Sequence, residues 1–184
     1  FSEIGPLAGQ IDLAVTDKVA TAGSCFAQHI GKALRKRGAN YLDFETKPDY
    51  LSDDEAGQHG FGIYSCRYGN IYTVRQLRQL AEEALSGFSP VETVWEKDGR
   101  YYDALRPSVD PVGHADAKIV VNLRKRHIEK VRELLSTLDV LVFTLGLTEG
   151  WVSADESTVF PACPGTAAGQ FDSAKYRFKN FTYS

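Results

Sequence analysis

The sequence predicts an α/β fold built around a mostly parallel sheet, and three observations support this. Residues 18–44 show a strand pattern, a helix pattern and a second strand pattern, which is the order of a βαβ unit. Residues 139–145 carry a continuous apolar run, typical of a strand covered on both faces. A long amphipathic segment at 115–136 precedes that run. Helices that join strands in this order pack on the faces of a parallel sheet.

The first unit begins with a short strand at 18–21 and continues with a helix at 25–37. Gly38 supplies the helix stop, and the cationic cluster at 34–37 suits a helix C-terminus, where the helix dipole favours positive charge. A second strand follows at 40–44, and the short connection through one helix predicts that the two strands are parallel. The helix has one apolar face, formed by Phe26, Ala27, Ile30, Ala33 and Leu34.

Caps, turn signals and apolar stripes predict the remaining elements. Thr73 is a suitable N-cap for a helix over 73–85. Residues 93–103 predict a β-hairpin inserted into the α/β core, because Asp98 and Gly99 form a strong turn signal. The candidate buried positions of the helix at 115–136 are Ile119, Leu123, Ile128, Val131, Leu134 and Leu135. No regular element is predicted for the lead-in at 1–18, the polar stretch at 45–70 or the loops after residue 145.

Composition and charge exclude several classes of protein. The 184 residues carry a net charge of −3, so the basic excess typical of nucleic-acid binding is absent. No apolar run approaches the roughly 20 residues that span a bilayer, so no membrane contact is expected. The three cysteines are widely spaced and form no zinc pattern, and free thiols fit a reducing, cytoplasmic location. The absence of Met indicates a fragment of a longer protein.

Ser24 is the first candidate for chemistry, because it lies in a small-residue turn between the first strand and its helix. Ligands of open parallel sheets bind at the carboxyl ends of the strands, where this turn lies. The N-terminus of a helix adds unpaired N–H groups and a dipole, which both favour an oxyanion. The alternative is that Ser24 only caps the helix, since Ser is among the best N-cap residues.

Several motifs in order resemble those of the GSCFA family. Residues 23–27 read GSCFA, and the resemblance spans residues 15–184. The other matching stretches are YGNIYT at 68–73, TLGLTEGW at 144–151, FPACPG at 160–165 and FKNFTY at 178–183. The family resembles a branch of the SGNH, or GDSL-like, hydrolase superfamily. This resemblance implies a three-layer αβα sandwich with a flavodoxin-like sheet. Residues 1–184 are then the N-terminal portion of one domain whose C-terminal strands are missing.

The resemblance also implies roles for individual residues. Ser24 matches the nucleophilic serine, whose own N–H also helps to bind the oxyanion, and Gly69 matches the glycine whose N–H is a second oxyanion donor. Thr148 stands where the superfamily usually has an Asn that donates to the oxyanion. Asn70 is our candidate for the missing amide, and the alternative is that it only shapes a turn. Glu149 is a candidate substrate contact or orienting group, and the alternative is that it is only a solvated carboxylate.

The superfamily's Asp-x-x-His pair does not occur in the sequence. We therefore expect the activating histidine to lie outside this chain, and the chain alone to be inactive. His29 is expected on the surface, and His59, His114 and His127 are expected to be solvated. Cys25 is expected to be a small core thiol rather than a nucleophile.

The predicted function is that of an SGNH-type serine hydrolase, either an esterase or an acyltransferase. Its substrate is a small or carbohydrate-linked O-acyl ester, and Ser24 forms the acyl-enzyme. No metal or organic cofactor is implied. The alternative is a non-catalytic binding domain that holds a glycan or a peptide in the same cleft. The sequence does not predict an oligomeric state.

Overall fold

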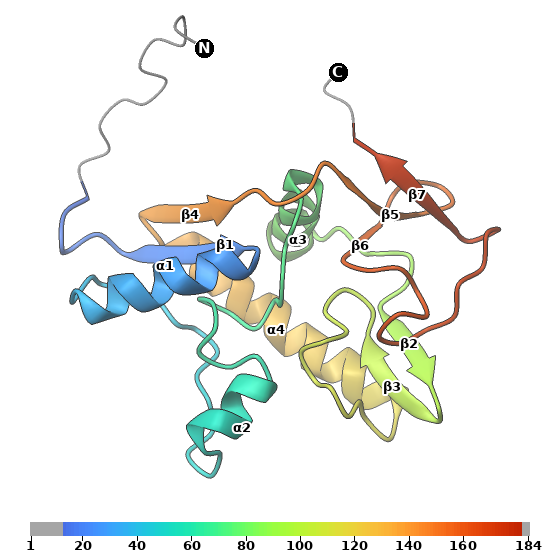
Figure 1. Ribbon diagram of the computed structural model, residues 1–184, viewed down its shortest axis with the longest axis horizontal. Helices are drawn as coiled ribbons and strands as arrows, with labels where there is room; N and C mark the ends of the chain where they lie inside the picture. The colour runs from blue at the N-terminus through green and yellow to red at the C-terminus, as the bar shows by residue number, and fades with distance from the viewer. Residues whose placement is uncertain (1–12, 182–184) are drawn as a thin grey trace, which may run out of the picture.

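The computed structural model describes residues 13–181 and has mixed α/β character, as predicted (Figure 1). Residues 1–12 of the predicted lead-in therefore lie outside the described residues, and so do positions 182 and 183 of the last motif. The elements in chain order are β1 (Val19–Gly23), α1 (Cys25–Lys36), α2 (Asp53–Gln58), α3 (Val74–Ser86), β2 (Val94–Lys97), β3 (Arg100–Asp103), α4 (Ala117–Thr137), β4 (Val140–Thr144), β5 (Glu149–Ser153), β6 (Val159–Phe160) and β7 (Tyr176–Asn180).

Strands β1 and β4 form a parallel pair that runs from Val19↔Val140 to Gly23↔Thr144. Paired residues are 121 positions apart in the sequence. The predicted strand at 40–44 shrinks to one parallel bridge between Val19 and Tyr41. Its direction is as predicted, but its length is wrong. The reason is that the chain turns away after Leu42, and Phe44 N–H donates to the carbonyl of Ser65 instead.

The main core lies between this strand pair, α1, α3 and α4. The small residues Ala20 and Ala22 of β1 allow neighbours to approach closely, and Val131 and Leu134 of α4 are buried in the same cluster. Two tyrosines of the predicted polar stretch, Tyr64 and Tyr68, also belong to it. Figure 1 shows α1 beside β1, while α4 crosses the molecule toward the β2–β3 hairpin. The carboxyl ends of β1 and β4 are thereby held at one edge.

The β2–β3 hairpin forms as predicted, with Val94 paired to Asp103. Asp98 and Gly99 both have positive φ, 53° and 71°, which is the backbone of a tight hairpin turn. The predicted stretch without regular structure also contains a short helix, α2. Ser52 and Glu55 form its capping box, a signal that was present in the sequence.

The region after β4 differs from the prediction, which expected only loops there. Strands β6, β5 and β7 form an antiparallel sheet, with Trp151 paired to both Phe160 and Phe178. These strands are short, and their pairing depends on cross-strand aromatic contacts that periodicity within one strand does not reveal. The described strands thus form three small sheets, and the three-layer, flavodoxin-like arrangement stays a prediction. Within residues 13–181, none of the helices combines the length and the apolar character that crossing a bilayer requires.

Candidate active site

Ser24 lies at the joint between β1 and α1, at the carboxyl edge of the parallel pair. Its backbone is extended (φ −77°, ψ −178°), and it occupies the N-cap position of α1. Its side chain nevertheless makes no capping hydrogen bond to the helix. Instead, Ser24 Oγ lies 3.2 Å from Thr144 Oγ1 at the end of β4. Ser24 is 7% exposed, so its hydroxyl is held at the sheet edge with little access to bulk water.

Thr144 holds Ser24 by the backbone as well, because Ser24 N–H donates to Thr144 Oγ1 over 3.0 Å. This close approach depends on Gly23, which has φ +130° and pairs with Thr144 in the strand register. A Cβ on Gly23 would overlap Thr144 Oγ1 and lie 2.6 Å from the Thr144 carbonyl oxygen. Glycine is therefore required before the serine by both conformation and space. The Ser24 N–H that we expected to hold an oxyanion is engaged with Thr144 in this structure.

Asn70 is positioned by two tyrosines rather than by the turn that contains it. Asn70 Nδ2 donates to Tyr72 Oη over 3.0 Å, and its Oδ1 lies 2.5 Å from Tyr64 Oη. The same Tyr64 hydroxyl lies 3.1 Å from the Ser24 carbonyl oxygen, so it bridges Asn70 and Ser24. Burial raises the pKa of Tyr64, which keeps its proton available for donation. The amide of Asn70 has a second hydrogen on Nδ2, which no hydrogen bond among the described residues uses.

Gly146 places a third motif beside the serine. A Cβ built on Gly146 would lie 3.6 Å from Ser24 Cβ and 3.4 Å from Tyr72 Cδ1. Ser24 and the Tyr72 ring therefore both lie close to one backbone position. Gly69 has φ +70° and lines a cavity together with Asn70. The structure thus brings Ser24, Asn70 and Gly146 into one cluster, with Gly69 adjoining Asn70.

Thr148 and Glu149 lie further along the chain, where β5 begins. Thr148 is exposed, and its hydroxyl donates to the carboxylate of Glu149 over 3.0 Å. No hydrogen bond among the described residues joins either side chain to Ser24. The Thr148 hydroxyl therefore donates to Glu149, whereas the Asn that the superfamily usually has here would donate to an oxyanion.

Two cavities share the wall formed by Tyr72, Pro161 and Ala162. One has a volume of about 220 Å³ and is lined by Gly69, Asn70, Arg106 and Ser108 among others. The other has a volume of about 200 Å³ and is lined by Leu147, Glu149, Trp151 and Phe178 among others. Pro161 and Ala162 belong to the FPACPG motif, so this motif forms part of the cavity wall. Ser24 itself does not line either cavity, but Gly146 lies close both to Ser24 and to the Tyr72 ring of their common wall.

The histidines lie elsewhere, and within residues 13–181 none of them forms a hydrogen bond with Ser24. His29 is exposed, as predicted. His127 is 1% exposed, and its Nδ1 lies 2.7 Å from Glu45 Oε2, so the prediction of a solvated ring is wrong. Burial, aided by the Arg106 cation, lowers the pKa of His127 to about 4, although the hydrogen bond to Glu45 opposes this. The ring is therefore neutral near pH 7 and donates its Nδ1 proton to the carboxylate.

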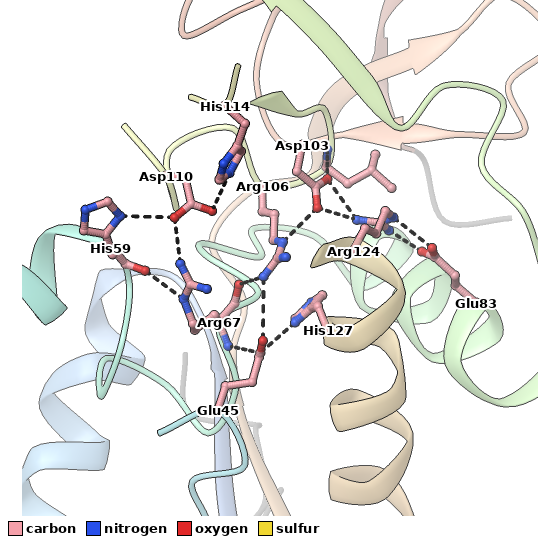
Figure 2. A network of polar contacts seen from close by, with 11 residues as sticks. Glu45, His59, Arg67, Glu83, Asp103, Arg106, Asp110, His114, Arg124 and His127 are labelled. Carbon is pink, nitrogen blue, oxygen red and sulfur yellow. Dashed lines mark hydrogen bonds and ion pairs between the residues drawn. The ribbon is translucent and has the colours of Figure 1, made fainter. Parts of the chain in front are cut away.

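His59 and His114 are also partnered rather than solvated, since both contact Asp110 (Figure 2). Asp110 Oδ1 lies 3.1 Å from His59 Nδ1 and 2.9 Å from Arg67 Nη2. Burial favours a raised pKa for Asp110, but the Arg67 cation, the hydrogen bond from His59 and the nearby Arg106 together outweigh it, and the pKa is lowered. This carboxylate therefore stays ionised and ties the end of α2 to the loop after β3.

Figure 2 shows that these histidines belong to a buried polar network that sequence analysis missed. Arg124 of α4 contacts Asp103 of β3 over 3.0 Å and also pairs with Glu83 of α3. Arg106 Nε donates to Asp103 over 2.8 Å. The network joins α3, α4, the hairpin and the loop around Glu45. Its role is to hold the elements around the cavities in place.

Cys25 is exposed at the first position of α1, so the prediction of a core thiol is wrong for this residue. Ser24 points toward β4, whereas Cys25, the next residue, is exposed to solvent. Across residues 13–181, no group of three or more His, Cys, Asp or Glu side chains is arranged so that it could hold a metal ion.

Comparison with known proteins gives one match. A sequence model of the GSCFA family matches residues 18–184, which is nearly the whole chain. No curated protein and no solved structure matches the chain.

Proposed function

Because the chain belongs to the GSCFA family, we propose that it acts as a serine hydrolase of the SGNH type. The reaction is ester cleavage or acyl transfer on a small or carbohydrate-linked O-acyl ester. The observation that carries this proposal is the position of Ser24. Its hydroxyl lies at the carboxyl edge of a parallel strand pair and points away from the helix it could cap. A serine released from capping in this way has its oxygen available as a nucleophile.

In the proposed mechanism, Ser24 Oγ attacks the ester carbonyl and loses its proton to a histidine. The C–O bond to the alcohol then breaks, the alcohol takes a proton, and Ser24 keeps the acyl group. Water completes hydrolysis, and a second alcohol completes acyl transfer. Since no histidine among residues 13–181 hydrogen-bonds to Ser24, the proposal assigns the base to the Asp–His pair that the resemblance predicts outside this chain.

The oxyanion of the tetrahedral intermediate needs donors that are held in place before the reaction. We assign this role to the second hydrogen of Asn70 Nδ2 and to the Gly69 N–H. Tyr64 and Tyr72 hold both ends of the Asn70 amide by hydrogen bonds. The amide therefore loses little conformational entropy when it binds an oxyanion. Thr148 is a weaker candidate because its hydroxyl already donates to Glu149.

One observation favours a second candidate function, a non-catalytic domain that binds a glycan or a peptide. The Ser24 N–H is engaged by Thr144, and an oxyanion at Ser24 would have to displace that bond. A protein that uses the cavities only for binding would keep this arrangement.

Labelling with a fluorophosphonate probe separates the two functions. The full-length protein is compared with its Ser24→Ala and Cys25→Ala variants, because Cys25 is the exposed neighbour that also carries a nucleophile. The hydrolase proposal expects labelling of the wild type and of Cys25→Ala, and none of Ser24→Ala. Labelling that survives in Ser24→Ala, or an unlabelled wild type, contradicts it.

A further inference from the structure

One face of the β6–β5–β7 sheet combines aromatic and polar side chains in a regular pattern. In the register of β5 and β7, Trp151 pairs with Phe178, and Glu149 pairs with Asn180. Paired residues lie on the same side of a sheet, and so do residues two apart on one strand. An aromatic pair and a carboxylate–amide pair therefore lie side by side on one face.

The aromatic side chains form a row that runs from the core to the surface. At its buried end, Phe160 stacks on Trp95 with ring centroids 5.4 Å apart. Trp151 pairs with Phe160 across the strands and contacts Phe178 with centroids 5.4 Å apart. Phe178, at the outer end, is 60% exposed. The row is anchored in the core at Phe160 and presents aromatic surface at Phe178.

This face borders the cavity of about 200 Å³, whose lining includes Glu149, Trp151 and Phe178. The lining of this cavity also includes Tyr72, whose ring lies beside Gly146. Gly146 also lies close to Ser24, so Tyr72 and Gly146 connect the lining of this cavity to the serine.

We propose that this cavity binds an uncharged sugar unit, as the alcohol side of the ester that Ser24 cleaves. The inference rests on the proposed function and adds to it the class of the alcohol and the residues that hold it. The C–H face of a sugar ring packs on Trp151 and Phe178, as apolar surface packs on aromatic rings. Its hydroxyls donate to the Glu149 carboxylate, which lines the cavity.

The alternative occupant, a long acyl chain, fits this face less well. An acyl chain offers no hydrogen bond to Glu149, and covering a carboxylate whose side-chain donor among the described residues is Thr148 alone is costly. The wall is also open to water at Phe178, whereas an acyl chain gains most from full enclosure. The carboxylate disfavours acidic sugars by charge repulsion, so neutral sugars are the expected class.

The test uses the full-length protein and unesterified oligosaccharides, which bind without being turned over. The probes are cellohexaose, xylohexaose and chitohexaose, with hexagalacturonic acid as the acidic comparison. Affinity is measured by calorimetry for the wild type, Trp151→Ala and Phe178→Ala. Phe178→Ala removes an exposed ring and should leave the fold intact, so the test stays valid if Trp151→Ala does not fold. Tyr50→Ala removes an exposed aromatic ring outside this cavity and is the matched control.

We expect at least one neutral hexasaccharide to bind, with affinity at least tenfold lower in Trp151→Ala and clearly lower in Phe178→Ala. Tyr50→Ala should bind as the wild type does, and the acidic hexasaccharide should not bind. The inference is overturned if no neutral hexasaccharide binds, or if both cavity variants bind as the wild type does. Probe labelling of Ser24 is independent of this result. Labelling without sugar binding contradicts only the proposed sugar site. Sugar binding without labelling contradicts only the proposed hydrolase activity.

Discussion

Thr144 Oγ1 contacts Ser24 twice, as the acceptor of its backbone N–H over 3.0 Å and as the neighbour of its hydroxyl at 3.2 Å. One side-chain oxygen of β4 thus holds both the backbone and the side chain of the proposed nucleophile. The contact exists only because β1 and β4 are paired in register up to Gly23 and Thr144. Thr144 is therefore a positioning residue in this account, and it can be tested separately from Ser24.

Replacing Thr144 by Val removes the hydroxyl but keeps the shape of the side chain. We expect the rate of fluorophosphonate labelling of Ser24 to fall about tenfold or more, because the serine is then free to rotate and cap the helix. Loss of the buried hydrogen bond should also lower the free energy of unfolding by about 1–2 kcal/mol. Thr144→Ser retains the oxygen and should restore the labelling rate. Equal labelling of Thr144→Val and the wild type would show that Thr144 does not position Ser24.

Gly23→Ala should destabilise the protein by about 2–4 kcal/mol, because the new methyl group meets Thr144 and the backbone has φ +130°. The free energy of unfolding in urea measures this. Gly57→Ala is the matched control, since Gly57 lies in α2 with no atom within 4 Å of an added Cβ. That variant should change stability by less than about 1 kcal/mol. A Gly23→Ala protein as stable as Gly57→Ala would contradict the described register.

His127 makes the stability of the protein depend on pH. Its pKa is lowered to about 4 in the folded state, whereas in the unfolded chain it is near the ordinary value of 6.5. Between these values the unfolded chain binds the additional proton, so the free energy of unfolding falls as pH drops from about 6.5 toward 4. Glu45 acts in the same direction at lower pH, because His127 and Arg106 lower its pKa despite its burial.

The check is urea unfolding at several pH values between 7 and 4.5. His127→Gln should lose most of the decrease in stability across this window, although its stability at pH 7 will be lower. His29→Gln, at an exposed position on α1, should follow the wild-type curve. A wild-type stability that does not change from pH 7 to pH 5 would rule out a buried neutral His127.

Arg124 connects α4 to both β3 and α3 from a buried position. Arg124→Ala leaves Asp103 and Glu83 without this cation, and we expect it to cost about 3–5 kcal/mol of unfolding free energy. Arg78→Ala removes a helix-surface ion pair whose Arg side chain is 74% exposed, and it should cost less than about 1 kcal/mol. Chemical denaturation of the two variants compares them directly, and similar costs would contradict a buried network.

Sequence periodicity predicted the long helices, the hairpin and strands β1 and β4, but it missed α2 and the strands after β4 and gave few of the long-range contacts. On α4 it identified Val131 and Leu134 correctly, but Ile119 is 43% exposed. The buried positions of α4 are Val120, Arg124, His127, Val131 and Leu134. These five follow a regular spacing of four and three residues, which was visible in the sequence. Two of them are charged or titratable, so a pattern based on apolar residues did not include them.

The partners of these polar residues could not be predicted from one sequence. Glu45 and His127 are 82 positions apart, and their pairing depends on where the chain turns after Leu42. For the site, the resemblance pointed to Ser24 and to Asn70, and the structure brings both together with Gly146 of the third motif. The roles of Thr144 and Tyr64 needed side-chain geometry, since a Thr at a strand end and a Tyr in a polar stretch have no distinctive pattern.

The central claim is that Ser24 is the nucleophile, and peptide mapping by mass spectrometry tests it most directly. The full-length protein is treated with a fluorophosphonate, digested, and the peptide that contains Ser24 and Cys25 is fragmented to locate the adduct. We expect one phosphonyl group, on Ser24. An adduct on Cys25 or on another residue, or an unmodified peptide from folded protein, would contradict it.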